Sequence, residues 1–414
     1  MTIDSISSIH LDNKRVARPV PVHLPALDGI RGLAALFVVL GHAMLYYQLE
    51  TSDNVLPGYG LDKVLAHGKW AVSMFIVLSG FCLMAPVVRS GGVLTGGALQ
   101  YLKRRARRIL PPYYAALGLS LLGIWLIPAL SKPGGNFWNL ALPAFRTDVI
   151  LSHVLMVFNL NNNWIFKINP PFWSVATEWQ IYFLFPFVFL PVLRKWGYAA
   201  LLLVAFAIGL IPHFLLQRTG WSVSDAHPWF TGLFAFGMLA AVACFQPETR
   251  IVAHWLRKYP QWIALTGCLM VCALELFTDW RGKKQLPYDL AYGIASAGFL
   301  VFLTRGCTGS GPDHVVARTL RTLLGWKPIK ALGDMSYSLY LIHTPVLIVV
   351  HRWTTPWHTS ALRVLSIMFG IGVPMSILVA SVFHVCFERP FMRQRGKSRS
   401  LVRFEKPQLS VGVG

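Results

Sequence analysis

The chain alternates between long apolar runs and short polar connections along most of its 414 residues. An α-helix needs about 20 mostly apolar residues to cross the hydrocarbon core of a bilayer. Stretches of this kind occur at roughly 30–49, 69–89, 111–130, 173–193, 197–216, 228–246, 260–277, 286–304, 330–350 and 364–387. The pattern therefore predicts an all-α fold, a polytopic membrane helix bundle with about ten transmembrane helices.

One connection, residues 131–172, is much longer than the others. Its segment HVLMVFNLNNNW is too short to span a bilayer, so we expect a re-entrant or surface helix there. We detect neither an internal repeat nor a second soluble domain. The predicted organisation is a flexible cytoplasmic N-terminal arm (1–24), a membrane domain (25–390) and a basic cytoplasmic tail (391–414).

The composition supports a membrane protein, because 55% of the residues are hydrophobic and only 13% are charged. A soluble protein carries about a quarter charged residues. The net charge of +21 is typical of nucleic-acid binding, but membrane proteins gather Lys and Arg in their cytoplasmic loops. Without a basic soluble domain, no nucleic-acid partner is expected. The six cysteines mostly lie in apolar runs, so we expect neither disulfides nor a metal site.

The distribution of Lys and Arg predicts the orientation of the bundle. With ten spans, the segments on the side of both termini hold 26 of the 38 basic residues, those on the other side hold 11, and Arg31 lies inside the first span. The positive-inside rule then places both termini in the cytoplasm. The loop DWRGKKQLP, outside in this scheme, is an exception with three basic residues.

The first span, DGIRGLAALFVVLGHA, carries two ionisable residues, Arg31 and His42. They are eleven residues apart, which is about three helical turns and roughly 16 Å, so they share a face. Arg31 is expected at the cytoplasmic interface, where Asp28 can pair with it, and His42 near the middle of the bilayer. Ionisable groups in a membrane usually mark a functional path. The alternative is a buried histidine satisfied by a neighbouring carbonyl or hydroxyl.

Two further spans bring polar side chains to a similar depth. Ser79, in MFIVLSGF, lies about ten residues into its span, although Ser-Gly is also a packing notch for helices. Glu178, in PPFWSVATEWQIYF, lies roughly 9 Å below the outer surface. A carboxylate there needs a partner, and His42 is the obvious one. Trp173, at the entrance, is either an interface anchor or a ligand platform.

The third span is preceded by the basic motif LKRRARRILPPYY. A positive-inside anchor is the simple interpretation of such a cluster. However, Arg105 and Arg108 are three residues apart and can face one ligand, and guanidinium groups suit phosphate. A cytosolic, phosphate-rich donor is therefore a candidate ligand.

The ninth span begins with LGDMSYSLYLIHTP, in which Ser336, Tyr340 and His343 recur at spacings of four and three. These residues line one helical face. Such stripes line cavities in enzymes and in transporters. A proton-coupled transporter or flippase, with a relay through His42, Glu178 and Asp334, is therefore the rival hypothesis. The absence of inverted repeats and paired broken helices disfavours it.

Together, five motifs resemble the membrane acyltransferase type 3 family: DGIRGLAALFVVLGHA, FIVLSGF, RRARRILPPYY, FWSVATEWQIYF and SYSLYLIH. They occur in the family's order between about residues 25 and 390. The resemblance implies an integral membrane O-acyltransferase that moves an acyl group, usually acetyl from acetyl-CoA, onto a hydroxyl of a bacterial cell-surface glycan or a small acceptor. It also implies the bacterial inner membrane, acyl-CoA as a donor substrate and no permanently bound cofactor. A glycan sensor or scaffold, a third possibility, needs no phosphate-binding arginines.

The resemblance also implies roles for single residues. His42 is similar to the family's essential histidine, and Arg31 to its basic partner. Arg105 and Arg108 resemble the Arg-x-x-Arg pair associated with the acyl donor, and Glu178 the first glutamate of a Trp-Ser-Leu-Ser-x-Glu-Glu stretch. The chain departs from the family pattern, which has a serine, a second glutamate and a common phenylalanine, at Ala176, Trp179 and Ile76.

These observations lead to an expected active site. His42 acts as a general base or a transient acyl carrier, and Glu178 holds its useful tautomer, as the acid of a triad does. We expect coenzyme A phosphates to bind Arg31, Arg105 and Arg108. The expected acceptor side is lined by Ser79, Trp173, Ser174, Tyr340 and His343.

Overall fold

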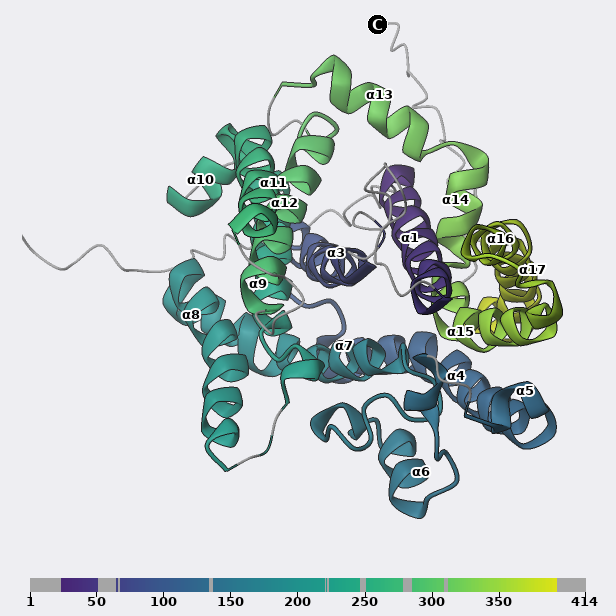
Figure 1. The fold of residues 1–414 in the computed structure, drawn as a ribbon. Coiled ribbons are helices and arrows are strands. Elements are labelled where there is room, and N and C mark those ends of the chain that lie inside the picture. The colour runs from purple at the N-terminus through teal and green to yellow at the C-terminus, as the bar shows by residue number, and fades with distance from the viewer. Residues whose placement is uncertain are drawn as a thin grey trace, which may run out of the picture.

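The described part of the chain is helical and contains no strand, as the computed structural model shows (Figure 1). The predicted all-α fold class is therefore confirmed. Almost all of the predicted N-terminal arm and basic tail lies outside the described residues. Only residues 24, 391 and 392 of these two segments are described. The structure describes residues 24–50, 65, 68–133, 137–219, 221, 223–245, 251–277, 285–308 and 312–392.

The apolar helices follow most of the predicted spans. They are α1 (Pro25–Glu50), α3 (Gly68–Arg89), α4 (Gly97–Leu126), α7 (Phe172–Leu184), α8 (Leu190–Gln217), α9 (Phe230–Phe245), α11 (Pro260–Phe277), α12 (Gln285–Thr304), α15 (Ser336–Trp353), α16 (Ala361–Ile367) and α17 (Val373–Phe383). Six stretches of the described residues are long and apolar enough to cross a membrane, and α9 and α11 are shorter apolar helices. The protein is a multi-pass membrane bundle.

Shorter helices connect and extend these spans. The α-helical ones are α5 (Pro128–Ser131), α6 (Thr147–Val154), α10 (Ile251–Lys258), α13 (Val315–Leu324) and α14 (Lys327–Asp334). Turns of 3-10 helix are η1 (Phe137–Ala141), η2 (Phe158–Leu160), η4 (Ser224–Ala226), η5 (Thr355–Trp357) and η8 (Arg389–Phe391). Turns of π-helix are η3 (Phe185–Phe189), η6 (Met368–Gly372) and η7 (His384–Glu388).

Three predicted boundaries were wrong. The third span starts at Gly97 rather than 111, so the basic cluster is helical and Pro111 and Pro112 lie inside α4, where they remove two intrahelical hydrogen bonds. The ninth divides at Met335, where α14 ends and α15 begins. The segment HVLMVFNLNNNW forms the end of α6, then η2 and turns, rather than one helix. Proline and short apolar runs are ambiguous signals, because they occur at helix starts and inside kinked helices.

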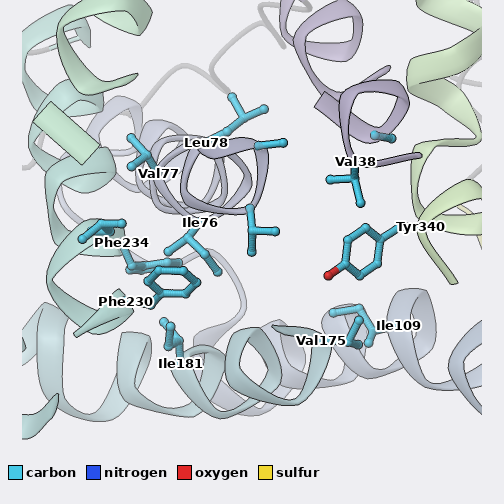
Figure 2. Close-up of a cluster of buried hydrophobic side chains, with 14 of the residues drawn as sticks. Val38, Ile76, Val77, Leu78, Ile109, Val175, Ile181, Phe230, Phe234 and Tyr340 are labelled. Atoms are coloured by element: carbon cyan, nitrogen blue, oxygen red, sulfur yellow. The ribbon is translucent and has the colours of Figure 1, made fainter. Parts of the chain in front are cut away.

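α1 and α3 lie in the middle of the view in Figure 1, with α9 and α12 on one side and α14 and α15 on the other. α4 and α7 run along a third side. In the core, Ile76 of α3 faces Phe230 and Phe234 of α9 (Figure 2). Both central helices therefore contribute to the cavity that they share with α4, α7 and α15.

Glycines allow these central helices to approach their neighbours. A Cβ added at Gly80 of α3 would collide with the carbonyl oxygen of Phe234, and one at Gly237 of α9 with that of Val77. Gly32 of α1 is similarly close to the backbone of α14. In a bilayer, apolar side chains gain nothing by leaving lipid, so close backbone packing at small residues holds helices together.

We predict that Gly237→Ala lowers the free energy of unfolding by about 1–3 kcal/mol, because the new methyl group forces α3 and α9 apart. Thermal unfolding of the purified, detergent-solubilised protein measures this effect. The matched control is Gly118→Ala on α4, where an added Cβ meets no atom within 4 Å. That variant should be as stable as the parent, or slightly more so. Equal destabilisation by both substitutions would contradict the proposed packing.

Candidate functional site

A cavity with about 870 Å³ of unfilled space opens between α1, α3, α4, α7 and α15. Its polar lining residues are Arg31, Ser79, Cys82, Arg105, Arg108, Ser174, Glu178, Tyr182, Ser336, Tyr337 and Tyr340. Its apolar wall is formed by Val72, Phe75, Ile76, Leu83, Ile109 and Val175. Seven of the ten predicted site residues therefore share one cavity; His42, Trp173 and His343 are the exceptions.

Three arginines gather in this cavity. α4 presents Arg105 and Arg108 one turn apart on the same face, and α1 contributes Arg31. The guanidinium of Arg31 donates to Asp28 Oδ1 at 3.2 Å and to Cys82 Sγ at 3.1 Å. Among the described residues, Arg105 Nε is buried without a hydrogen-bond partner. A buried, cationic group with unused donors is suited to a phosphate-bearing ligand.

Hydroxyl and carboxyl groups form a hydrogen-bonded chain in the same cavity. The Tyr182 hydroxyl donates to Glu178 Oε1 at 2.6 Å. Because a phenol has one proton, Ser79 Oγ is then the donor in its 2.9 Å contact with Tyr182. Glu178 and Tyr182 are one turn apart on α7, so a single helix face places both.

The two predicted histidines contact each other. His42 Nδ1 on α1 lies 2.7 Å from His343 Nε2 on α15, and the two ring planes are within 20° of each other, with centroids 4.9 Å apart. His343 is fully buried, and its Nδ1 lies 3.0 Å and 2.9 Å from the carbonyl oxygens of Leu339 and Tyr340. The pair thus joins two helices that are 301 residues apart in sequence at this point.

This geometry corrects two predictions. Glu178 was expected to hold the tautomer of His42, but the structure pairs Glu178 with Tyr182 and His42 with His343. His343 was expected to line the acceptor side, but it lies buried outside the cavity lining. Equal depth in the bilayer made the Glu178 pairing plausible, but depth does not determine which helices are neighbours.

Tyr340 lies between the cavity and the histidine pair. Its ring lines the cavity and is 6.0 Å from the ring of His343. Its hydroxyl donates to the carbonyl oxygen of Pro171 at 3.0 Å and contacts Ser174 Oγ at 2.6 Å. Phe75 meets Tyr340 edge to face, with centroids 6.3 Å apart. These side chains form the wall nearest the histidines.

Trp173, outside the cavity lining, belongs to a second buried network. Its ring stacks on His227 with centroids 4.8 Å apart. His227 Nδ1 lies 2.5 Å from Asp289 Oδ2, and the same carboxylate accepts hydrogen bonds from Trp229 at 2.8 Å and Ser73 at 3.1 Å. A buried carboxylate is tolerated when several donors surround it, so this network ties α3, α7 and α12 together.

Tyr182, Cys82 and Glu388 are among the polar groups at or near the cavity that sequence reasoning missed. Tyr182 follows Glu178 by four residues, and Cys82 follows Ser79 by three, so helical spacing alone could have found both. The third, Glu388, is a buried carboxylate that accepts from Ser338 Oγ at 2.5 Å and contacts His384 at 2.8 Å. In the sequence, Glu388 could have been found as a charged residue directly after the last apolar run.

Asp334, which the rival transporter hypothesis needs, is not among the residues that line the cavity. It ends α14 and forms an ion pair with Lys330 at 2.9 Å. The proposed relay through His42, Glu178 and Asp334 is therefore not assembled. The described residues also contain no group of three or more His, Cys, Asp or Glu side chains that could hold a metal ion.

Comparisons with a family model and with curated proteins agree on an acyltransferase family. The family model described as "Acyltransferase domain" matches residues 24–385. Among curated proteins, the acyltransferase MdmB of Streptomyces mycarofaciens is 25% identical over 94% of this chain and 97% of its own length. The peptidoglycan O-acetyltransferase OatA of Listeria monocytogenes is 26% identical over 83% of this chain. The O-acetyltransferase OatA of Staphylococcus aureus is 21% identical over 95% of it.

The two OatA proteins are longer than this chain, which spans 52% of the Listeria protein and 61% of the Staphylococcus protein. No solved structure matches the chain. The family model nevertheless covers the helices that build the cavity and the histidine pair. The chain therefore belongs to the family defined by this acyltransferase domain and is a multi-pass membrane acyltransferase.

Proposed function

We propose that the protein moves an acyl group, acetyl in the simplest case, from acyl-CoA to a hydroxyl of a glycan or small-molecule acceptor. One observation carries this proposal: three arginines and a hydroxyl–carboxyl chain share a cavity whose wall, at Tyr340, adjoins a pair of histidines. The name of the Listeria relative, a peptidoglycan O-acetyltransferase, supports a glycan hydroxyl as acceptor.

The arginines are proposed to bind the donor. Coenzyme A carries several phosphates, and Arg31, Arg105 and Arg108 supply convergent guanidinium groups for them. The apolar wall formed by Val72 and Phe75 leaves room for the neutral end of the molecule. Acyl-CoA is thus a substrate that enters and leaves, not a resident cofactor.

His42 is proposed to perform the transfer by one of two routes. As a general base, it takes the hydroxyl proton while the hydroxyl oxygen attacks the thioester carbonyl and coenzyme A leaves as its thiolate, which is then protonated. As a nucleophile, its imidazole first takes the acyl group and then yields it to the hydroxyl. Both routes need an unprotonated nitrogen on His42. Because Tyr340 lines the cavity and its ring is 6.0 Å from that of His343, the acyl end must pass this ring to reach the histidines.

The orientation of the bundle fits this arrangement. The excess of Lys and Arg on the side of both termini supports cytoplasmic termini in a bacterial inner membrane. The basic residues of α4 then lie towards the cytoplasm, where acyl-CoA is made, and the acceptor approaches from the opposite side.

We predict that His42→Ala reduces acyl transfer by at least about 100-fold, because the base or acyl carrier is lost. The assay incubates purified, reconstituted protein with radiolabelled acetyl-CoA and follows label in protein, glycan and small-molecule fractions. His254→Ala, at an exposed histidine of α10, is the control and should retain activity. Undiminished transfer by His42→Ala would refute the mechanism, and uptake into vesicles without covalent product would indicate a transporter.

We predict that the double variant Arg105→Ala/Arg108→Ala raises the KM for acetyl-CoA by at least about tenfold, because each charge-assisted hydrogen bond contributes about 1.5–3 kcal/mol. The matched control is Lys103→Ala/Arg107→Ala, which removes the same charge from exposed positions of the same helix. Its KM should stay close to that of the parent. Equal increases in both variants would mean that the cluster acts only through its overall charge.

A further inference from the structure

The hydrogen bonds of His343 determine where its proton lies. Its Nδ1 is within 3.0 Å of the Leu339 carbonyl oxygen and within 2.9 Å of the Tyr340 carbonyl oxygen. Carbonyl oxygens only accept hydrogen bonds, so Nδ1 must carry the proton. In a neutral imidazole the other nitrogen is then an acceptor. The Nε2 atom of His343 therefore presents a lone pair.

The proton on His42 follows from this assignment. The 2.7 Å contact between His42 Nδ1 and His343 Nε2 requires one proton between the two atoms. Since Nε2 of His343 is the acceptor, Nδ1 of His42 is the donor. A neutral His42 then has its lone pair on Nε2, the nitrogen that would take a proton or an acyl group.

We propose that His343 is a positioning residue that selects the reactive tautomer of His42. In a Ser-His-Asp triad, a buried carboxylate bonds the Nδ1–H of the catalytic histidine and holds its orientation. Here a neutral imidazole performs that task, and its own proton is held by main-chain carbonyls of α15. Glu178 is not needed for this purpose, because it is bonded to Tyr182.

The contacts around His343 hold its ring in one position, as a hydrogen-bond partner of His42 requires. Its side chain is fully buried, and its two carbonyl acceptors belong to the preceding turn of its own helix, so the ring is anchored to α15 itself. Thr344 Oγ1 lies 3.2 Å from the same Nε2 and can donate a second, weaker hydrogen bond to it. An anchored acceptor keeps the ring of His42 in one orientation while substrates enter and leave.

This inference rests on the proposed function in one respect only, namely that His42 Nε2 takes part in acyl transfer. Replacement of His343 by Gln places an amide oxygen near the position of Nε2 and so keeps an acceptor for His42 Nδ1–H. Leu has a similar size but no acceptor. We expect His343→Leu to lower kcat by about 100-fold with an unchanged KM for acetyl-CoA, and His343→Gln to recover most of the lost kcat.

Thr304→Val is the control, since it removes a buried hydroxyl of α12 that is bonded to the Leu300 carbonyl oxygen and does not line the cavity. Its kcat should remain close to that of the parent. Wild-type kcat in His343→Leu, or equal losses in folded Leu and Gln variants, would overturn the proposal. Membrane-inserted protein and retained coenzyme A binding identify folded variants.

A second measurement does not depend on activity. Nitrogen NMR of the reconstituted protein with ¹⁵N-labelled histidine, compared with His42→Ala, isolates the signals of His42. We expect a protonated Nδ1 and an unprotonated Nε2 near neutral pH, and the reverse tautomer would overturn the proposal. If the wild-type protein shows no acyl transfer, the proposed function fails, while this spectrum still decides the tautomer.

Discussion

Close approach of helix backbones is the constraint on which the site depends. Inside a bilayer there is no hydrophobic drive to bring apolar helices together, so contact requires small residues at the crossing points. Gly80 against α9 and Gly32 against α14 hold α3 and α1 in place. Those two helices then direct Ser79 and Arg31 into one cavity.

The cavity brings arginines and a carboxylate together without pairing them with each other. Arg31 is held by Asp28, whereas Glu178 is engaged by a tyrosine rather than by an arginine. The guanidinium groups of α4 therefore keep donors for a bound anion. Tyr340 stands between this polar space and the histidines, so the proposed donor site and the proposed reactive histidine occupy adjacent compartments.

Much of this architecture follows from sequence pattern. Span positions, the shared face of Arg105 and Arg108, and the placement of Ser79 and Glu178 in one cavity need only helical periodicity and depth. Neighbour relations do not follow in the same way. The contact of His42 with His343 depends on how α1 and α15 pack side by side, and periodicity contains no information about which helices are adjacent. The network around Asp289 was missed for the same reason, since its donors come from α3 and from the distant segment that holds His227 and Trp229.

The partner of His42 has an electrical consequence. A carboxylate at the mid-bilayer depth expected for His42 would put a formal charge inside the hydrocarbon core, where charge is costly and responds to the membrane voltage by about 2.3 kcal/mol per 100 mV for full transfer. In the proposed arrangement both imidazoles are neutral, with His343 anchored to the peptide carbonyls of α15, so the pair carries no net charge. The resting histidine pair is therefore indifferent to the membrane potential, and a cell can energise or depolarise its membrane without displacing the residues that hold the reactive nitrogen.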